Sequence, residues 1–111
     1  MSARKLPLVL SARAQRDVHD ILLYTRKQWG TAKRSEYRRV LYHGLSELQT
    51  FPEMGRSREE IAPGLRSFPV GWYTVYYGIR ETDLFVHRVF HASRDIGPGD
   101  LDDSQPELDR S

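Results

Sequence analysis

His91 is the side chain in this sequence best placed to do proton chemistry. It ends a short apolar segment and precedes Ser93, Arg94 and Asp95. A neutral imidazole can act as a general base near pH 7, and guanidinium groups can stabilise the charge of a phosphoryl-transfer transition state. His91, Arg66 and Arg94 are therefore the candidate catalytic residues. The alternative is a strand-end histidine that hydrogen-bonds a neighbour.

The residue types argue against a metal or another cofactor. His87 and His91 are expected on the same face of one strand, but at ~3.3 Å per residue they would stand ~13 Å apart. That separation is too large for both to bind one metal ion. The chain also has no cysteine, which excludes disulfides, thiolate nucleophiles and cysteine-bound zinc. We therefore predict no metal site and no cofactor.

The apolar pattern predicts a strand and two helices in the first half of the chain. Residues 6–10 are expected to form a short edge strand, and helical spacing of apolar residues follows on both sides of Gly30. Ser11 is expected to cap the first helix and Gly30 to end it. Because the turn is so short, the two helices should form an antiparallel hairpin, with Trp29 plugging its base.

The second half is expected to add three strands to the sheet. Aromatic and β-branched residues predict strands over 65–68, 72–80 and 84–91, after a polar connection over 52–63. The resulting fold class is α+β: an N-terminal strand, an antiparallel helical hairpin and a three-strand antiparallel meander, with the helices on one face of the sheet.

The last strand is apolar on both faces. Strict alternation would put Leu84, Val86 and Phe90 on one face and Phe85 and Val89 on the other. A sheet with one wet face alternates more cleanly. We therefore expect the second face to be covered by the C-terminal segment or by a partner.

The charges divide the chain into a basic body and an acidic end. Residues 97–111 contain five acids and one base, a charge of −4, so residues 1–96 carry +6 of the formal total of +2. We predict one domain over 1–96 and an acidic, flexible tail over 97–111. A basic body suggests an acidic partner. The apolar run at 6–10 is too short for a membrane span or a secretory signal, so the chain is expected to be cytoplasmic.

Several side chains are candidates for contacting that partner. One of Trp72 and Tyr73 should point away from the helices, where an exposed aromatic ring suits a partner's apolar helix. Arg94 and Asp95 are expected to tie the strand end to another segment, with Glu60 as the suggested partner of Arg94. The candidates for binding are Arg66, Trp72, Tyr73, Phe85, Val89 and Arg94.

Five ordered segments carry a family resemblance. They are Trp29-Gly30, Phe51-Pro52-Glu53-Met54-Gly55-Arg56, Glu60-Ile61-Ala62-Pro63-Gly64-Leu65-Arg66, Gly71-Trp72-Tyr73-Thr74-Val75-Tyr76-Tyr77 and Arg88-Val89-Phe90-His91-Ala92-Ser93-Arg94-Asp95. In that order and spacing they resemble the RelE/ParE superfamily of bacterial toxins, and more closely the ParE branch, also described as plasmid-stabilisation proteins. The resemblance spans about residues 6–95 and implies the same α+β arrangement.

The resemblance implies a toxin of a type II toxin–antitoxin system that inhibits DNA gyrase. Such a toxin blocks replication as a binding module rather than as an enzyme, and a ParD-like antitoxin neutralises it. It would meet DNA only indirectly, through the antitoxin or gyrase, and would not bind a membrane.

Two alternatives stay open. RelE-like relatives are ribosome-dependent mRNA endoribonucleases, but Trp72–Tyr76 stands where they place a central-strand arginine, and Ala92 stands where a catalytic tyrosine would follow the histidine. A non-toxic remnant that keeps only antitoxin binding is the other alternative.

Overall fold

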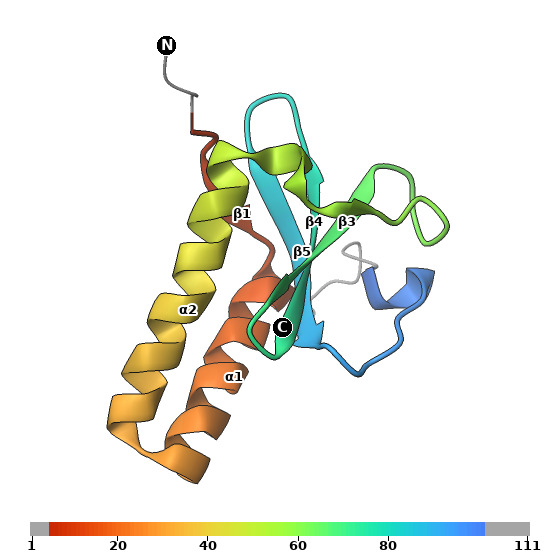
Figure 1. Ribbon diagram of the computed structural model, residues 1–111. Helices are drawn as coiled ribbons and strands as arrows, with labels where there is room; N and C mark the ends of the chain where they lie inside the picture. The colour runs from red at the N-terminus through yellow and green to blue at the C-terminus, as the bar shows by residue number, and fades with distance from the viewer. Residues whose placement is uncertain (1–4, 102–111) are drawn as a thin grey trace.

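The computed structural model describes residues 5–101 and consists of two long helices packed on one face of a five-stranded sheet (Figure 1). This arrangement confirms the predicted α+β class with a helical hairpin. In chain order the elements are β1 (Leu8–Leu10), α1 (Ala12–Trp29), α2 (Thr31–Thr50), η1 (Pro52–Met54), β2 (Arg56–Ser57), β3 (Leu65–Val70), β4 (Tyr73–Ile79), β5 (Leu84–His91) and η2 (Pro98–Leu101).

The sheet is mixed, with the strand order β1-β5-β4-β3-β2. Strands β3, β4 and β5 form the predicted antiparallel meander. β1 extends it by pairing parallel with β5, and β2 extends the other edge by pairing antiparallel with β3. The sequence did not predict β2, which lies in the expected polar connection, because two residues are too few to show a period-2 pattern.

Local capping defines the helical hairpin. The Ser11 hydroxyl accepts the Ala14 N–H at 2.9 Å, as predicted for an N-cap, and donates to the His87 carbonyl at 2.8 Å. Gly30 joins the helices at a φ of 95°, a conformation that favours glycine. The expected burial of Trp29 is wrong, since its side chain is 62% exposed. The hairpin tip extends past the sheet, which leaves nothing there to cover the indole (Figure 1).

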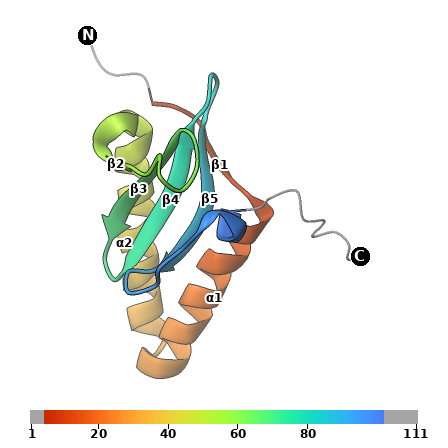
Figure 2. The same cartoon turned by 90° about the vertical axis from the view of Figure 1, so that its right-hand side faces the viewer.

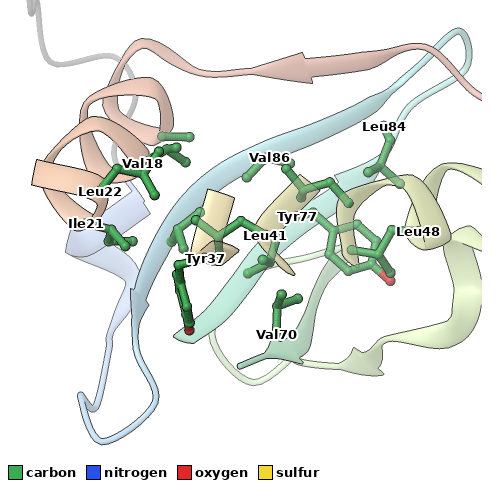
Figure 3. Close-up of a cluster of buried hydrophobic side chains, with 14 residues drawn as sticks. Val18, Ile21, Leu22, Tyr37, Leu41, Leu48, Val70, Tyr77, Leu84 and Val86 are labelled. Carbon is green, nitrogen blue, oxygen red and sulfur yellow. The ribbon is translucent and has the colours of Figure 1, made fainter. Parts of the chain in front are cut away.

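The main core lies between the hairpin and the sheet (Figure 3). Each large apolar side chain buried there contributes about 1.5–3 kcal/mol relative to exposure. Val40 continues the helical spacing of apolar residues that the sequence shows after Gly30, but it is 37% exposed because it lies off the α2 face that meets the sheet. The largest fully buried side chains are those of Leu41, Leu45, Leu48, Val75, Tyr77, Leu84 and Val86.

A bulge in β5 overturns the predicted assignment of its faces. Tyr76 pairs with Arg88 but Tyr77 pairs with Val86, so one extra residue, His87, enters β5. An extra residue shifts all following side chains to the opposite face. Val89, expected to point outward, is therefore buried in the main core, and Phe90 lies in a second cluster on the other face.

The same bulge separates two histidines that were expected on one face. His87 packs edge-on against Phe85, whereas His91 packs against Tyr73, which lies on the helix side of the sheet. The two imidazole rings therefore lie on opposite faces of β5.

The second cluster covers the sheet face opposite the helices, the face turned to the viewer in Figure 2. Leu65, Tyr76 and Phe90 form it, and Ile96 and Leu101 pack against it from the C-terminal segment. The predicted tail thus begins with the ordered turn η2, which covers part of this face as expected. The rest of that tail, from residue 102, lies outside the described residues.

Candidate functional site

His91 is a strand-end histidine that hydrogen-bonds a neighbour, which was the alternative to a catalytic role. Its Nδ1 accepts the Ser93 N–H at 3.1 Å and lies 2.9 Å from the Ser93 hydroxyl. These bonds place the proton of the neutral ring on Nε2. The nitrogen that could accept a proton is already engaged, and the other presents an N–H donor. This geometry does not suit a general base.

Arg66 binds backbone carbonyls at the opposite end of the sheet. Its guanidinium donates to the Gly55 carbonyl at 2.7 Å and to the Glu53 carbonyl at 3.3 Å. Tyr77 holds the same loop, because its hydroxyl donates to the Pro52 carbonyl at 2.6 Å and accepts the Gly55 N–H at 3.0 Å. Burial raises the pKa of this phenol above 10.0. Arg66 and Tyr77 together fix η1 on the sheet.

Arg94 contacts the C-terminal turn and not the segment predicted for it. Its guanidinium donates to Asp100 at 2.8 Å and lies 4.2 Å from the centre of the Phe90 ring. Glu60, the suggested partner, instead accepts from Arg58 at 2.7 Å. That pairing was not predicted because Arg58 and Glu60 lie in an irregular loop without a periodic pattern.

The fold separates the three candidate catalytic residues. His91 is opposite Tyr73 and Arg66 is opposite Tyr77, four residues apart on β4 or ~13 Å along the strand. Arg94 lies over Phe90 on the other face. Within residues 5–101, no three histidines, aspartates or glutamates converge as metal ligands. The structure assembles no nuclease-like centre from these residues.

The aromatic candidates for binding behave differently from one another. Trp72 is 62% exposed and stacks on Tyr37, whose hydroxyl accepts the Trp72 N–H at 2.7 Å. Tyr73 is half-buried and packs edge-on against the same ring. Trp72 is therefore the exposed member of the pair, although it lies against α2 rather than on the far face.

The two β5 candidates also differ. Phe85 is half-buried, with the Arg80 guanidinium 4.2 Å from its ring centre. Val89 is buried in the main core, so the expectation that it contacts a partner is wrong; the bulge at His87 turned it inward.

An arginine-lined hollow lies on the sheet face opposite the helices and was not predicted from the sequence. It has a volume of about 590 Å³. Arg56 and Arg58 enter it from the β2 edge, and Arg94 from beyond β5. Because these segments are distant in sequence, local spacing carried no signal for the hollow. Its lining is Arg56, Arg58, Ser67, Pro69, Thr74, Tyr76, Ala92, Arg94, Asp95 and Ile96.

Hydrogen bonds and nearby charges at the rim of the hollow shift the pKa values of Arg58, Glu60 and Asp100. The hydrogen bond from Arg58 lowers the pKa of Glu60, and the same bond raises the pKa of the Arg58 guanidinium. Asp100 has its pKa lowered below 3.8, chiefly by the Gly97 N–H and then by the charge of Arg94. The carboxylates are therefore held in their charged form beside the arginines.

The lowered pKa of Asp100 predicts an acid-sensitive C-terminal turn. A depressed folded-state pKa gives stability that is complete above the ordinary pKa near 3.8 and lost as pH falls through the folded value. Because the pair is partly exposed, this stability should be below about 1 kcal/mol. The protection of the Gly97 amide against hydrogen exchange should therefore fall as pH drops below about 4, and D100A, which removes the acceptor of the Gly97 N–H, should show low protection at every pH. Protection of the Gly97 amide that stays constant over this pH range in the unsubstituted protein would contradict the prediction.

Among the described residues, neither long helix is apolar enough to span a bilayer.

Comparisons with known proteins address identity. A model of the ParE toxin of the type II toxin–antitoxin system parDE matches residues 8–96. Toxin ParE1 of Mycobacterium tuberculosis is 34% identical over 97 residues, covering 86% of this chain and 96% of the relative. Toxin ParE1 of Caulobacter vibrioides is 33% identical over 94 residues, with coverage of 82% and 98%.

Solved structures share the fold. A chromosomal ParDE system from P. aeruginosa superposes with a TM-score of 0.68 at 16% identity, covering 78% of this chain and 96% of that one. The RelBE2 toxin–antitoxin complex of M. tuberculosis gives 0.50 at 20% identity, with coverage of 79% and 99%. The sequence match, which extends from β1 through the end of β5, shows that this chain belongs to the ParE toxin family of type II toxin–antitoxin systems.

Proposed function

We propose that this ParE-family toxin inhibits DNA gyrase in the cytoplasm, thereby blocking replication, and that a ParD-like antitoxin neutralises it. The observation that carries the proposal is the family match over residues 8–96. The dispersal of His91, Arg66 and Arg94 supports a binding module over a nuclease, because phosphoryl transfer needs these charges at one point.

Two further observations support an antitoxin as partner. Solved relatives of this fold are described as a ParDE system and as a toxin–antitoxin complex. The basic body of the chain, +6 over residues 1–96 by the sequence, would attract an acidic protein segment. Co-expression with the protein encoded beside it should give a complex that elutes as one species in size-exclusion chromatography. Separate elution of the two proteins would count against the antitoxin.

Purified gyrase tests the target. The protein should suppress supercoiling and increase gyrase-dependent DNA cleavage in proportion to its concentration. Gyrase that supercoils and cleaves DNA normally at a high molar excess of the protein would contradict the proposal.

The two tryptophans provide a matched pair of variants for this assay. Trp72 and Trp29 are both 62% exposed, but only Trp72 stands at the sheet beside Tyr37 and Tyr73. Exposed aromatic anchors carry much of the energy of protein interfaces. We predict that W72A weakens gyrase inhibition or antitoxin binding about tenfold or more, whereas W29A changes neither. Circular dichroism spectra of W72A and W29A serve as the control for folding. Equal effects of the two variants on gyrase inhibition and antitoxin binding would contradict the prediction.

A further inference from the structure

The arginine hollow combines positive charge with an apolar floor. Its three arginines face Tyr76 and Ile96, which belong to the cluster of apolar side chains on this face of the sheet. The hydroxyl-bearing residues Ser67 and Thr74 also line it. A ligand that fits would therefore carry negative charge and apolar groups together.

Two of the guanidinium groups are held in place by aromatic rings and carboxylates. Arg58 lies 5.8 Å from the centre of the Tyr76 ring and donates through Nε to Glu60, and Arg94 lies over Phe90 and donates to Asp100. Each guanidinium has five N–H donors, so these bonds leave others for a ligand.

Arg56 is the most accessible of the three arginines. Its side chain is exposed and makes no hydrogen bond within the part of the chain that the structure describes. Because it lies across the hollow from Arg94, on the opposite edge of the meander, a bound anion would meet positive charge from two sides. Positively charged groups that converge in this way favour bidentate recognition of carboxylate or phosphate.

We propose that this hollow binds an acidic peptide segment, and, given the proposed function on which this inference rests, that the segment belongs to the antitoxin. Carboxylate side chains of the segment pair with Arg56, Arg58 and Arg94, and its apolar side chains pack on Tyr76 and Ile96. The hollow is thus the place on the toxin where the acidic segment of the antitoxin docks.

The lining favours a peptide over a nucleic acid. Asp95 stands among the arginines, and its carboxylate would repel the evenly spaced phosphates of a nucleic-acid strand. A peptide can place an apolar or amide-bearing residue opposite Asp95. Arg58 already donates to the Glu60 carboxylate and Arg94 to the Asp100 carboxylate, so both guanidinium groups are suited to pairing with carboxylates.

Fluorescence anisotropy with defined probes tests the site on the full chain. The probe is a labelled short peptide with glutamate at alternate positions and leucine or alanine between them. A glutamine version of that peptide and a labelled oligothymidylate of similar length are the comparison probes. The glutamate peptide should bind, and its affinity should fall with added salt, whereas the glutamine peptide should not bind.

Matched variants locate the binding. R56Q should weaken binding of the glutamate peptide about fivefold, and R56Q/R94Q more than about tenfold. R39Q makes the same change of charge on the exposed face of α2, in the other layer of the fold, and should leave binding unchanged. Equal losses in R39Q and R56Q would show non-specific attraction and would overturn the proposal.

Other outcomes also decide the matter. Binding of the oligothymidylate, lost in R56Q, with no binding of the glutamate peptide would overturn the proposal in favour of a phosphodiester ligand. A different outcome is binding of the glutamate peptide only to a variant in which four acidic residues are replaced by their amides. That result would overturn the proposal and assign the hollow to the chain's own acidic segment, which contains Asp102, Asp103, Glu107 and Asp109.

The experiment separates this inference from the proposed function. An antitoxin complex that forms with full affinity in R56Q/R94Q would leave the proposed function standing and refute the docking site. Failure to form any complex would refute the antitoxin, while the peptide titration would still report whether the hollow binds carboxylates.

Discussion

Replacing Asp17 with alanine is expected to lower the free energy of unfolding by about 3 kcal/mol. The Asp17 carboxylate accepts from Arg88 Nε at 2.8 Å and Nη2 at 2.9 Å, and from the Val89 N–H at 2.9 Å. The two charged side chains are only 14% and 17% exposed. Alanine would leave the Val89 N–H without its acceptor and would remove the Asp17 carboxylate from the Arg88 guanidinium, at the point where α1 meets the bulged end of β5.

Urea unfolding measures this loss, and Asp20 provides the control. Asp20 lies on the same helix, but its side chain is 70% exposed, and within residues 5–101 its carboxylate lies 3.5 Å from the imidazole of the adjacent His19. D20A should change the free energy of unfolding by less than about 0.5 kcal/mol. If D17A costs no more than D20A, the ion pair does not join the helix to the sheet in the way described.

Replacing Gly71 with alanine is expected to cost about 3 kcal/mol in the free energy of unfolding. Gly71 has a φ of 60°, and a Cβ there would overlap the Tyr37 hydroxyl. That hydroxyl accepts the Trp72 N–H at 2.7 Å, so moving it also breaks the hydrogen bond that seats the β3–β4 turn on α2. Strain and steric overlap therefore add at this position.

Gly64 isolates the strain from the overlap. It has a φ of 75°, but a Cβ there would meet open space. G64A should cost about 1 kcal/mol, the penalty of the left-handed conformation alone. Thermal or urea unfolding of both variants gives the comparison. Losses of equal size would show that the contact with Tyr37 contributes nothing, contrary to the packing seen.

The elements of the fold could be predicted because each has a local cause. The Leu41, Leu45 and Leu48 stripe of α2 follows helical spacing, and the Ser11 cap and the Gly30 turn use the residue types that such positions require. The last strand was predicted with its observed bounds, Leu84–His91, because its residues are β-branched, aromatic and apolar.

The faces of that strand could not be predicted. Alternation assumes uninterrupted pairing, and the extra residue at His87 depends on how β5 aligns with β4. Phe90 and Val89 therefore exchanged faces relative to expectation. The ion pair between Arg88 and Asp17 could not be predicted either, since the two residues lie 71 positions apart in the sequence and no local pattern joins them.

The candidate site was predicted only as separate residues. The sequence identified His91, Arg66 and Arg94, but their hydrogen bonds to Ser93, Gly55 and Asp100 arise from loop geometry that sequence spacing does not encode. The arginine hollow also needs the β2 edge, the β4 surface and the segment after β5 to come together. Charge composition indicated an acidic partner without indicating where it binds.

The most direct test of the account follows DNA and protein synthesis by pulse labelling after the protein is induced in a bacterial host. The proposed gyrase inhibition predicts that DNA synthesis falls first and that a DNA-damage response follows. An earlier fall in protein synthesis would contradict it and would point to mRNA cleavage, despite the separation of His91, Arg66 and Arg94 in the fold.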